Sequence, residues 1–270
     1  MPHTLIRIDD LEDPRIAAYR DIRERDLVGR KGRFVAEGKV VLNVLFSTAR
    51  FAAESVLLRE NRVPGMTHII DRIPPEVPVY VASGDLMDAI AGFPMHRGVL
   101  AIGLRSEEEP AEALLARLPS EALVVALAGI SDHDNMGAIF RNAAAFGADA
   151  VIMDRTCCDP LYRKAIRVSV GAALKVPFAR GGSADAVADT LEAQGFQVLA
   201  LSPSGKQAIE DVERAPRCAL LLGAEGPGLP EALLSRLPSV RIPMRADFDS
   251  LNVATAAAIA LHRLWRPPTL

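Results

Sequence analysis

Cysteine and histidine are scarce in this chain, which limits the kinds of site it can build. Its 270 residues include three cysteines and five histidines. Cys157, Cys158 and Cys218 form no CxxC pair and are odd in number, so we expect buried or half-buried free thiols rather than disulfides or a zinc knuckle. His133 lies in "SDHDN", but no second histidine or cysteine is near it, and no metal ion is expected.

Long apolar runs are also absent. The longest, such as "ALVVALAGI" and "ALLLGA", have the length of a buried strand and are too short to span a bilayer. The N-terminal stretch "MPHTLIRIDDLEDPR" has acidic residues where a secretion signal would be basic and then apolar. The sequence therefore predicts a cytoplasmic protein with no membrane segment.

The chain has no overall excess of basic residues. Its formal net charge of -3 argues against a globally basic nucleic-acid binder, although a local basic face is enough for phosphate contacts. Arginine and lysine are concentrated in residues 15–33 and 155–180. For the first of these segments, a solvated helix face balanced by neighbouring acids is an equally good interpretation.

Apolar residues are present in the proportion that a packed core needs. Half of the chain is hydrophobic and 24% is charged. Residues 106–122 are acidic, contain two prolines and separate two regions of different texture, so we interpret them as a linker. Residues 1–105 alternate short strands and helices, as in a small α/β domain. Residues 123–270 alternate strands and helices more regularly, which is typical of a mostly parallel sheet with helices on both faces.

Ligands of open α/β sheets bind beyond the carboxyl ends of the strands, so three loops of the second region are candidate sites. The first, "SDHDNMGAIFR", carries Asn135 as a possible helix cap and Arg141 in an otherwise apolar helix. The third, "IPMRADFDSLN", carries Ser250 as a possible cap of the last helix and Asn252 in its first turn.

The second loop, "LLLGAEGPGLP", is rich in glycine and has one carboxylate. Gly223 follows a strand and would let a ligand approach the backbone, while Gly226 and Gly228 allow positive φ. Glu225 is the carboxylate. The loop matches neither GxGxxG nor a phosphate loop, which disfavours a generic nucleotide-binding enzyme.

Together, "DNMGAIFRNAAAFGADAVIM", "LLLGAEGPGLP" and "IPMRADFDSLNVATAAAIAL" resemble the three motifs of the SpoU (TrmH-like) family of RNA ribose 2'-O-methyltransferases, of the SPOUT superfamily. The resemblance covers about residues 120 to 266. "GRKGRFVAEGKVVLNVL" and "PMHRGVLAIG" resemble the ribosomal-protein-like, RNA-binding α/β domain often fused ahead of it. The resemblance implies a C-terminal trefoil knot, S-adenosylmethionine as cofactor and a homodimer.

The resemblance also implies roles for individual residues. Arg141 would be the catalytic residue, and because a guanidinium stays protonated we expect it to stabilise the developing alkoxide and bind phosphate rather than act as a base. Asn135, Glu225, Ser250 and Asn252 would order the catalytic pocket. The predicted cofactor contacts are Leu222, Gly223, Ile242, Met244 and Leu251, and the predicted RNA contacts are Arg23, Arg30, Lys31, Arg33, Arg163 and Lys164. His133 and Ala224 depart from the usual motif residues.

Two alternatives concern the substrate and the activity. The separate N-terminal domain favours ribosomal RNA over tRNA as the target. A non-catalytic RNA-binding protein on the same fold is disfavoured, because Arg141, Glu225 and Asn252 are all present.

Overall fold

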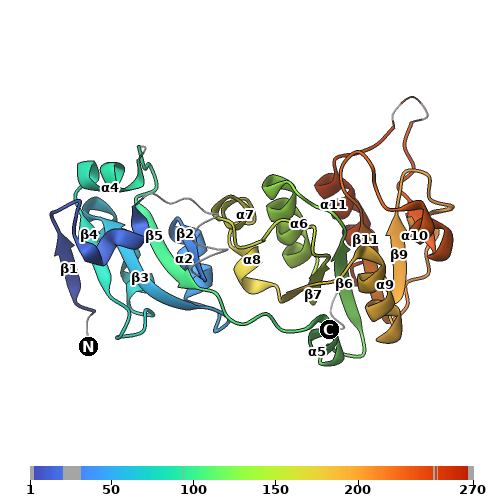
Figure 1. Cartoon of the computed structure of the whole chain (residues 1–270), viewed down its shortest axis with the longest axis horizontal. Helices are drawn as coiled ribbons and strands as arrows, with labels where there is room; N and C mark the ends of the chain where they lie inside the picture. Colours follow the sequence, from blue (N-terminus) through green and yellow to red (C-terminus); the bar gives the residue numbers. More distant parts are fainter. Residues whose placement is uncertain (1–2, 21–31, 93, 246, 248, 267–270) are drawn as a thin grey trace. The chain divides into compact units, whose positions relative to one another are not determined.

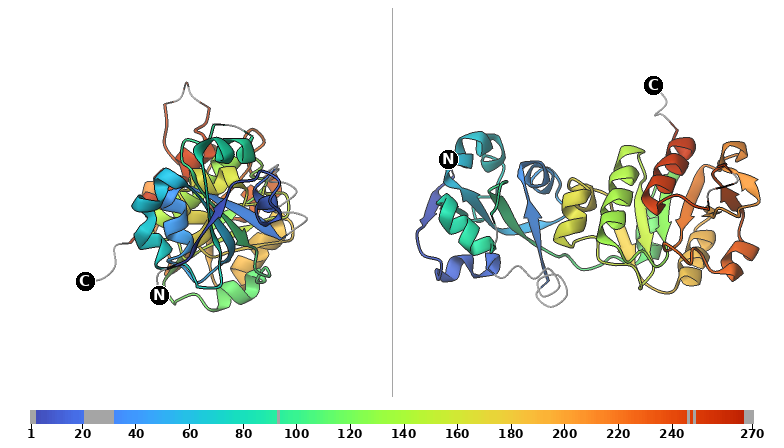
Figure 2. Two further views of the ribbon diagram at one scale, coloured as in Figure 1. Left: turned by 90° about the vertical axis from the view of Figure 1, so that its left-hand side faces the viewer. Right: turned by 90° about the horizontal axis from the view of Figure 1, so that it is seen from above.

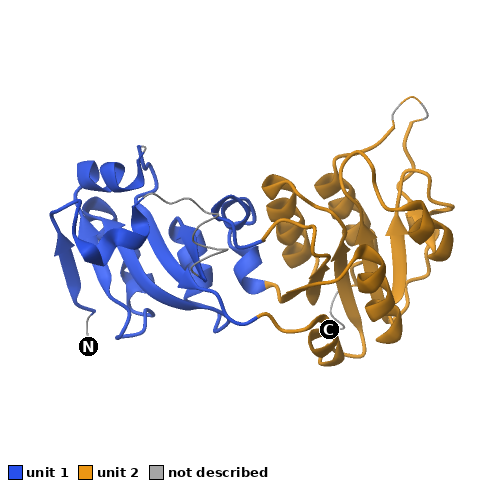
Figure 3. Ribbon diagram, viewed as in Figure 1, with its two compact units in different colours: residues 1–107, 160–175 blue, residues 108–159, 176–270 orange. Residues whose placement is uncertain are grey.

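The computed structural model describes residues 3–20, 32–92, 94–245, 247 and 249–266 (Figure 1). The chain divides into two compact units (Figure 3). The first comprises Met1–Glu107 and Pro160–Lys175, and the second comprises Glu108–Asp159 and Val176–Leu270. This division differs from the predicted one, because residues 160–175 group with the first unit.

The predicted linker at residues 106–122 is also largely structured. Helix α5 (Ala111–Ala116) lies within it, and Leu114 and Leu115 of this helix are fully buried in the second unit. Arg217 secures the end of α5 by donating hydrogen bonds to the carbonyls of Leu115, at 3.0 Å, and Leu118, at 3.3 Å. The leucines of "AEALLARL" therefore belong to a core and not to a spacer.

The described residues of the first unit form a five-stranded sheet in the order β1-β4-β3-β5-β2. The strands are β1 (Leu5–Ile8), β2 (Arg33–Glu37), β3 (Ala52–Arg59), β4 (Val79–Ala82) and β5 (Val99–Leu104). β4 pairs in parallel with β1 and β3, whereas β5 is antiparallel to β3 and β2. The carboxyl ends of β1, β2, β3 and β4 therefore share one edge with the amino end of β5.

Helical segments accompany this sheet: η1 (Pro14–Tyr19), α2 (Lys39–Leu45), η2 (Glu60–Met66), α3 (Thr67–Ile70), α4 (Gly84–Ala91), α7 (Arg163–Val168) and α8 (Ala172–Lys175). The short run "THII" reads as a strand by β propensity but forms α3. The stretch "PLYRKAIRVSVGA" at residues 160–172 favours a single helix by its sequence, but α7 and α8 are separate because Val170 and Gly171 have φ of 54° and 85°. Gly171 packs against Val44 of α2, where an added Cβ would lie 3.2 Å from the valine Cβ.

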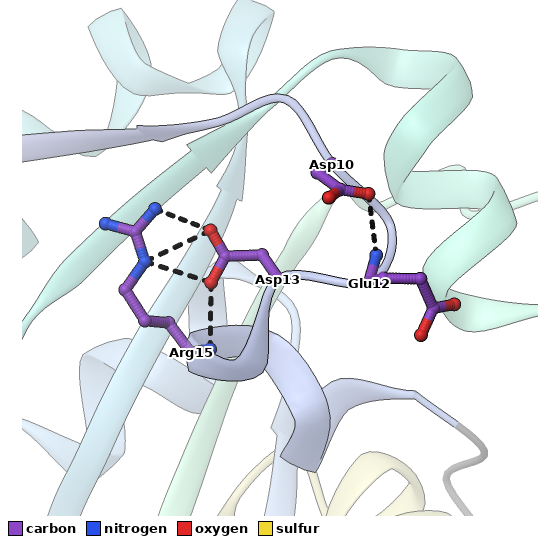
Figure 4. Close-up of polar contacts among 4 residues, drawn as sticks. All are labelled: Asp10, Glu12, Asp13 and Arg15. Atoms are coloured by element: carbon purple, nitrogen blue, oxygen red, sulfur yellow. Dashed lines mark hydrogen bonds and ion pairs between the residues drawn. The ribbon is translucent and has the colours of Figure 1, made fainter.

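The start of η1 shows how acidic and basic residues balance near the N-terminus (Figure 4). Asp13 caps η1 by accepting from the Arg15 backbone N–H at 2.9 Å, and it pairs with the Arg15 guanidinium at 2.5 Å. These hydrogen bonds lower the pKa of Asp13 to about 2. The stretch from Pro14 to Leu27 favours one helix by its sequence; residues 21–27 lie outside the described residues, and Pro14–Tyr19 forms a 3-10 helix.

The described residues of the second unit form a seven-stranded sheet in the order β10-β12-β9-β11-β6-β7-β8. The strands are β6 (Ala122–Leu127), β7 (Ala150–Met153), β8 (Phe178–Arg180), β9 (Gln197–Leu201), β10 (Gln207–Ala208), β11 (Arg217–Leu222) and β12 (Ser239–Arg241). Every pair of neighbours is parallel. The predicted parallel α/β sheet is confirmed.

Helices cover both faces of this sheet (Figure 2). Besides α5, they are α6 (His133–Ala145), α9 (Ala184–Ala193), η3 (Ile209–Asp211), α10 (Glu231–Arg236) and α11 (Val253–Leu264). Val124 and Leu221 pack with residues of α5, α9 and α10, whereas α6 and α11 cover the opposite face. Because both faces are covered, all six residues of β6 are buried, as its continuous apolar sequence predicts.

Helices α6 and α11 lie side by side (Figure 1). The Asn142 side chain of α6 donates a 2.8 Å hydrogen bond to the carbonyl of Ala254 in the first turn of α11. Small residues of α11, such as Ala257 and Ala260, are fully buried and allow the close approach. No helix in the described residues is both long and apolar enough to cross a bilayer.

Candidate active site

A cavity of about 310 Å³ lies beyond the carboxyl ends of β9, β11 and β12 in the second unit. This is the sheet edge at which ligands of parallel α/β folds bind, and the volume falls in the range of small-molecule sites. The predicted second and third loops form most of the lining. The lining residues are Leu201, Ser202, Pro203, Leu222, Gly223, Ala224, Glu225, Gly226, Gly228, Ile242, Met244, Ser250, Leu251, Asn252, Val253 and Ala256.

All five predicted cofactor contacts are in this lining. Leu222 is the last residue of β11, and Ile242 and Met244 follow β12. Leu251 precedes α11. The sequence prediction missed Leu201, Ser202 and Pro203, which end β9 and begin the next loop. β9 lies between β11 and β12, so its carboxyl end opens onto the same cavity, a relationship that depends on strand order.

Gly223 is required by the backbone around it. A Cβ at this position would lie 2.4 Å from the Gly228 carbonyl carbon and 2.5 Å from the Leu229 nitrogen. The loop turns back on itself here, with Gly228 N–H donating to the Ala224 carbonyl at 3.0 Å. Gly226 and Gly228 have φ of 84° and 69°, as predicted. Gly223 is thus needed in the first place because the loop folds back against it. The sequence predicted only that a glycine here would let a ligand approach the backbone.

Asn252 connects the three predicted loops. Its side-chain nitrogen donates to Asn135 Oδ1 at 2.8 Å and to Glu225 Oε1 at 2.7 Å. Its side-chain oxygen accepts from the backbone N–H groups of Ala254 and Thr255 and so caps α11. Both donors and both acceptor positions of one amide are therefore used.

Two of the predicted helix caps are wrong. Asn252, and not Ser250, caps α11, while Ser250 is an exposed residue of the cavity lining. Asp132, and not Asn135, caps α6, because its carboxylate accepts from the N–H groups of Asp134 and Asn135. Asn135 is thereby left inside α6, buried, with its side-chain oxygen facing Asn252.

Arg141 is not part of the cavity lining. It lies on α6, is exposed, and has no hydrogen-bond or ion-pair partner within the described part of the chain. The geometry of one chain thus brings together Asn135, Glu225 and Asn252 but leaves Arg141 outside. Its catalytic role stays a prediction.

The predicted RNA contacts belong to the first unit. Arg33 forms a 2.5 Å ion pair with Glu54, and Arg163 Nε lies 3.6 Å from the buried carboxylate of Glu37. Lys164 is half-buried on α7. Arg23, Arg30 and Lys31 lie outside the described residues.

The cysteines are free thiols, as predicted. Burial raises the pKa of Cys157 and of Cys158 to about 12, and that of Cys218 to about 11. The thiolate is the reactive form, so these groups are poor nucleophiles at neutral pH. None of the three lines the cavity.

The charge of the cavity restricts its ligand. Among the described residues that line the cavity, Glu225 is the one titratable side chain, and none is a lysine or an arginine. A polyphosphate would find no cationic partner there, whereas a cationic ligand with an apolar base would find a carboxylate and aliphatic walls. These residues fit S-adenosylmethionine, which carries a sulfonium, an adenine and no phosphate.

Known proteins resemble the chain in both sequence and fold. Residues 122–262 match the model of the SpoU rRNA Methylase family. An uncharacterized tRNA/rRNA methyltransferase of Mycobacterium bovis is 41% identical over 95% of this chain and 90% of its own. An AdoMet-bound rRNA methyltransferase from Sinorhizobium meliloti has a TM-score of 0.77 at 24% identity, over 96% of this chain and 97% of its own.

A further solved structure, an RNA 2'-O ribose methyltransferase, has a TM-score of 0.75 at 24% identity, over 97% of this chain and 98% of its own. The family match spans the three predicted loops and the first turns of the helices that they enter. The chain therefore belongs to the SpoU rRNA methylase family, the S-adenosylmethionine-dependent RNA methyltransferases that its three motifs resemble.

Proposed function

We propose that the protein methylates a ribose 2'-hydroxyl of structured RNA, with ribosomal RNA as the favoured target. The observation that carries this proposal is the cavity in which Glu225 is the only titratable side chain among the described lining residues, together with the Asn252 hydrogen bonds to Glu225 and Asn135. S-adenosylmethionine, when bound, supplies a methyl group on a sulfonium centre, which is already a good electrophile. The chain must then hold the hydroxyl oxygen in line and favour loss of its proton.

Positioning accounts for a large part of such catalysis, because well-oriented groups contribute on the order of 7–11 kcal/mol in favourable cases. In this proposal the Asn252 network keeps the loops after β11 and β12 in place around the cavity. Arg141 stabilises the developing negative charge on the ribose oxygen and binds the neighbouring phosphate. The proton leaves to phosphate or water, since a guanidinium has no free base form at neutral pH.

The proposal includes a homodimer, because Arg141 lies outside the cavity of its own chain. Arg141 is exposed on α6, and Ile259 and Trp265, at 41% and 42% exposure, add apolar surface on and just after the neighbouring α11. A second copy packed on α6 and α11 would cover these side chains. Arg141 of each copy would then lie at the cavity of the other copy. The two helices are neighbours, and Asn142 of α6 bonds to Ala254 in the first turn of α11.

We also propose the trefoil knot that the family resemblance implies. β12 is separated from β11 by β9, yet the chain returns after β12 so that α11 packs on β11 and α6. On this return it passes the loop after β11, where Asn252 bonds Glu225. Such a path favours threading of one loop by the C-terminal segment.

The preference for ribosomal RNA rests on the first unit. The rRNA methyltransferase from Sinorhizobium meliloti shares its fold with this chain over both units, since 96% of the chain is covered. tRNA is the alternative substrate, because the Mycobacterium bovis relative is described as a tRNA/rRNA methyltransferase. Either substrate agrees with a cytoplasmic location, which we propose as well.

Methyl transfer to defined RNAs tests the proposal. The purified protein is incubated with labelled S-adenosylmethionine and with ribosomal RNA, tRNA, or ribosomal fragments in which deoxynucleotides replace the ribonucleotides. We expect label in ribosomal RNA and none in the deoxy fragments, because the 2'-hydroxyl is the acceptor. Label in tRNA alone would reassign the substrate, and equal labelling of deoxy and ribo fragments would refute a ribose target.

A further inference from the structure

The arginines of the first unit fall into two groups. Arg15 pairs with Asp13 (Figure 4), Arg20 with Glu12 and Arg33 with Glu54, so these members of the predicted basic segment are neutralised by carboxylates. In contrast, Arg59, Arg62 and Arg97 have no carboxylate within 4.0 Å among the residues that the structure describes.

Arg59, Arg62 and Arg97 gather at one edge of the five-stranded sheet. Arg59 is the last residue of β3 and Arg62 follows it in η2, while Arg97 leads into β5. Since β5 is antiparallel to β3, its amino end lies at the carboxyl end of β3. A 2.8 Å hydrogen bond from Arg59 N–H to the Gly98 carbonyl joins the two segments.

Glycines provide the space in which these side chains lie. A Cβ on Gly84 would be 2.1 Å from Arg59 Nη2, and a Cβ on Gly98 would be 2.8 Å from Arg59 Cβ and 3.3 Å from Arg62 Cγ. Arg97 lies across Gly38, where a Cβ would be 3.3 Å from its Cδ and 3.4 Å from its Nη1. These glycines come from the connections after β4, before β5 and after β2, all at the same edge.

The backbone fixes the side chains further. Arg62 Nη2 donates to the His96 carbonyl at 2.8 Å, which holds η2 against the segment before β5. The acids nearest to β3 and β1 at this edge, Glu60 and Asp9, both pair with Arg7 and so do not neutralise the three arginines. Three arginines are thus held along one sheet edge by contacts with glycines and carbonyl groups, and the described residues place no carboxylate within 4.0 Å of their guanidinium groups.

We propose that Arg59, Arg62 and Arg97 form a site for successive phosphates of the RNA backbone, called here the three-arginine edge. A guanidinium is charged at every physiological pH and binds phosphate oxygens through two parallel N–H donors. Three of them along one edge suit a ligand with several phosphates in series better than a single inorganic anion. The proposal rests on the proposed function in one respect, namely that the substrate is RNA.

Salt-dependent RNA binding by the full chain tests the three-arginine edge. Fluorescence anisotropy with a labelled single-stranded RNA and with a labelled RNA hairpin compares the wild type with the Arg59→Gln, Arg62→Gln and Arg97→Gln variants and with the triple variant. Each lost phosphate contact lowers the slope of log affinity against log salt by about 0.7–0.9, which is about five- to eightfold in affinity at 0.1 M salt. By the same relation, we expect the RNA affinity of the triple variant to be about a hundredfold or more below that of the wild type.

A matched control and a charge-preserving variant make the test specific. Arg72 is exposed, bonds to the His68 carbonyl, and lies in the connection to the amino end of β4, at the opposite sheet edge, so Arg72→Gln should bind RNA as the wild type does. Gly84→Ala keeps every charge, and Gly84 has no positive φ, but its methyl group would displace the Arg59 guanidinium. Gly84→Ala should therefore weaken RNA binding as Arg59→Gln does.

The outcomes separate this proposal from the proposed function. Unchanged affinity and salt slope in the triple variant would overturn the three-arginine edge, and so would an equal loss in Arg72→Gln. Calorimetry with S-adenosylmethionine should give wild-type affinity for every variant, because none of these residues lines the cavity. Methyl transfer by the wild type to ribosomal RNA is measured independently. Absence of methyl transfer would refute the proposed function, whereas the anisotropy data alone decide whether the three-arginine edge binds phosphates.

Discussion

The side-chain nitrogen of Asn252 lies 2.7 Å from a carboxylate oxygen of Glu225, which is 27 positions earlier in the chain. This hydrogen bond joins the loop after β11 to the start of α11 at the rim of the cavity. The same amide caps α11 through its oxygen, so one side chain determines both where the last helix begins and where the glycine-rich loop lies.

Substitution of Asn252 should separate these two roles. Asn252→Ala removes the helix cap, and a cap of this kind contributes about 1 kcal/mol to the unfolding free energy. The same variant also loses the side-chain hydrogen bonds to Asn135 and Glu225. Asn252→Asp keeps a capping oxygen but cannot donate, and it places a second carboxylate beside Glu225. We expect Asn252→Asp to retain most of the unfolding free energy while binding S-adenosylmethionine more weakly, as measured by urea denaturation and calorimetry.

Ser183 provides the control for loss of a cap alone. Its hydroxyl caps α9 by accepting from the Ala186 N–H at 3.3 Å, and it is not in the cavity lining. Ser183→Ala should lower the unfolding free energy by about 1 kcal/mol, less than Asn252→Ala, which also loses two side-chain bonds, and should leave cofactor affinity unchanged. Wild-type cofactor affinity in Asn252→Asp would mean that the donated hydrogen bonds do not order the site.

Glu225→Gln tests whether the carboxylate recognises positive charge. Glutamine retains an oxygen that can accept from Asn252, but it removes the negative charge of the only titratable residue in the described lining. Glu225 is exposed, and exposed ion pairs contribute about 0.2–1 kcal/mol, so affinity for S-adenosylmethionine should fall by up to about fivefold. S-adenosylhomocysteine has no sulfonium and should bind the variant as it binds the wild type. An equal loss for both ligands in calorimetry would point to an effect on loop structure instead.

Gly223→Ala should disrupt the loop that turns back after β11. The new Cβ would lie 2.4–2.7 Å from backbone atoms of Gly228 and Leu229, which cannot move aside as a flexible side chain can. Overpacking of this kind typically costs 1–3 kcal/mol of unfolding free energy, and we expect about that loss together with weaker cofactor binding. Gly181→Ala is the control, because an added Cβ there meets nothing within 4 Å and the backbone φ is not positive. A stability loss of equal size in both variants would contradict this account.

Sequence patterns predicted the sheet of the second unit well, because β6 and β11 are apolar runs buried on both faces. They also predicted the positive φ at Gly226 and Gly228. Sequence patterns could not predict the strand order, because adjacency in a sheet is set by packing of distant segments. For the same reason they could not predict that Leu201 and Ser202 line the cavity.

The helix starts were harder to predict. Ser250 and Asn252 are both good capping residues, and the choice depends on hydrogen bonds to Glu225 and Asn135 that only the folded chain provides. Likewise, a count of basic residues selected the segment 15–33, where Arg15 and Arg33 have carboxylate partners. Charge compensation is a property of the fold, which is why Arg59 and Arg97 were overlooked.

Arg141 should act in the site of a second copy, if the proposed dimer forms. Arg141→Lys keeps the charge but loses the planar, bidentate donor, so we expect turnover to fall by tenfold or more, and Arg141→Gln to fall further. Neither variant should lose affinity for S-adenosylmethionine, because Arg141 is not in the cavity lining. Near-full turnover by Arg141→Lys would exclude a bidentate role.

A mixture of Arg141→Gln chains with Gly223→Ala chains then tests the dimer, since a mixed dimer contains one site with an intact cavity and an intact arginine from its partner. Recovered methyl transfer in the mixture, compared with either variant alone, would require Arg141 to act across the interface, whereas no recovery from dimers verified by light scattering would assign it to the site of its own chain.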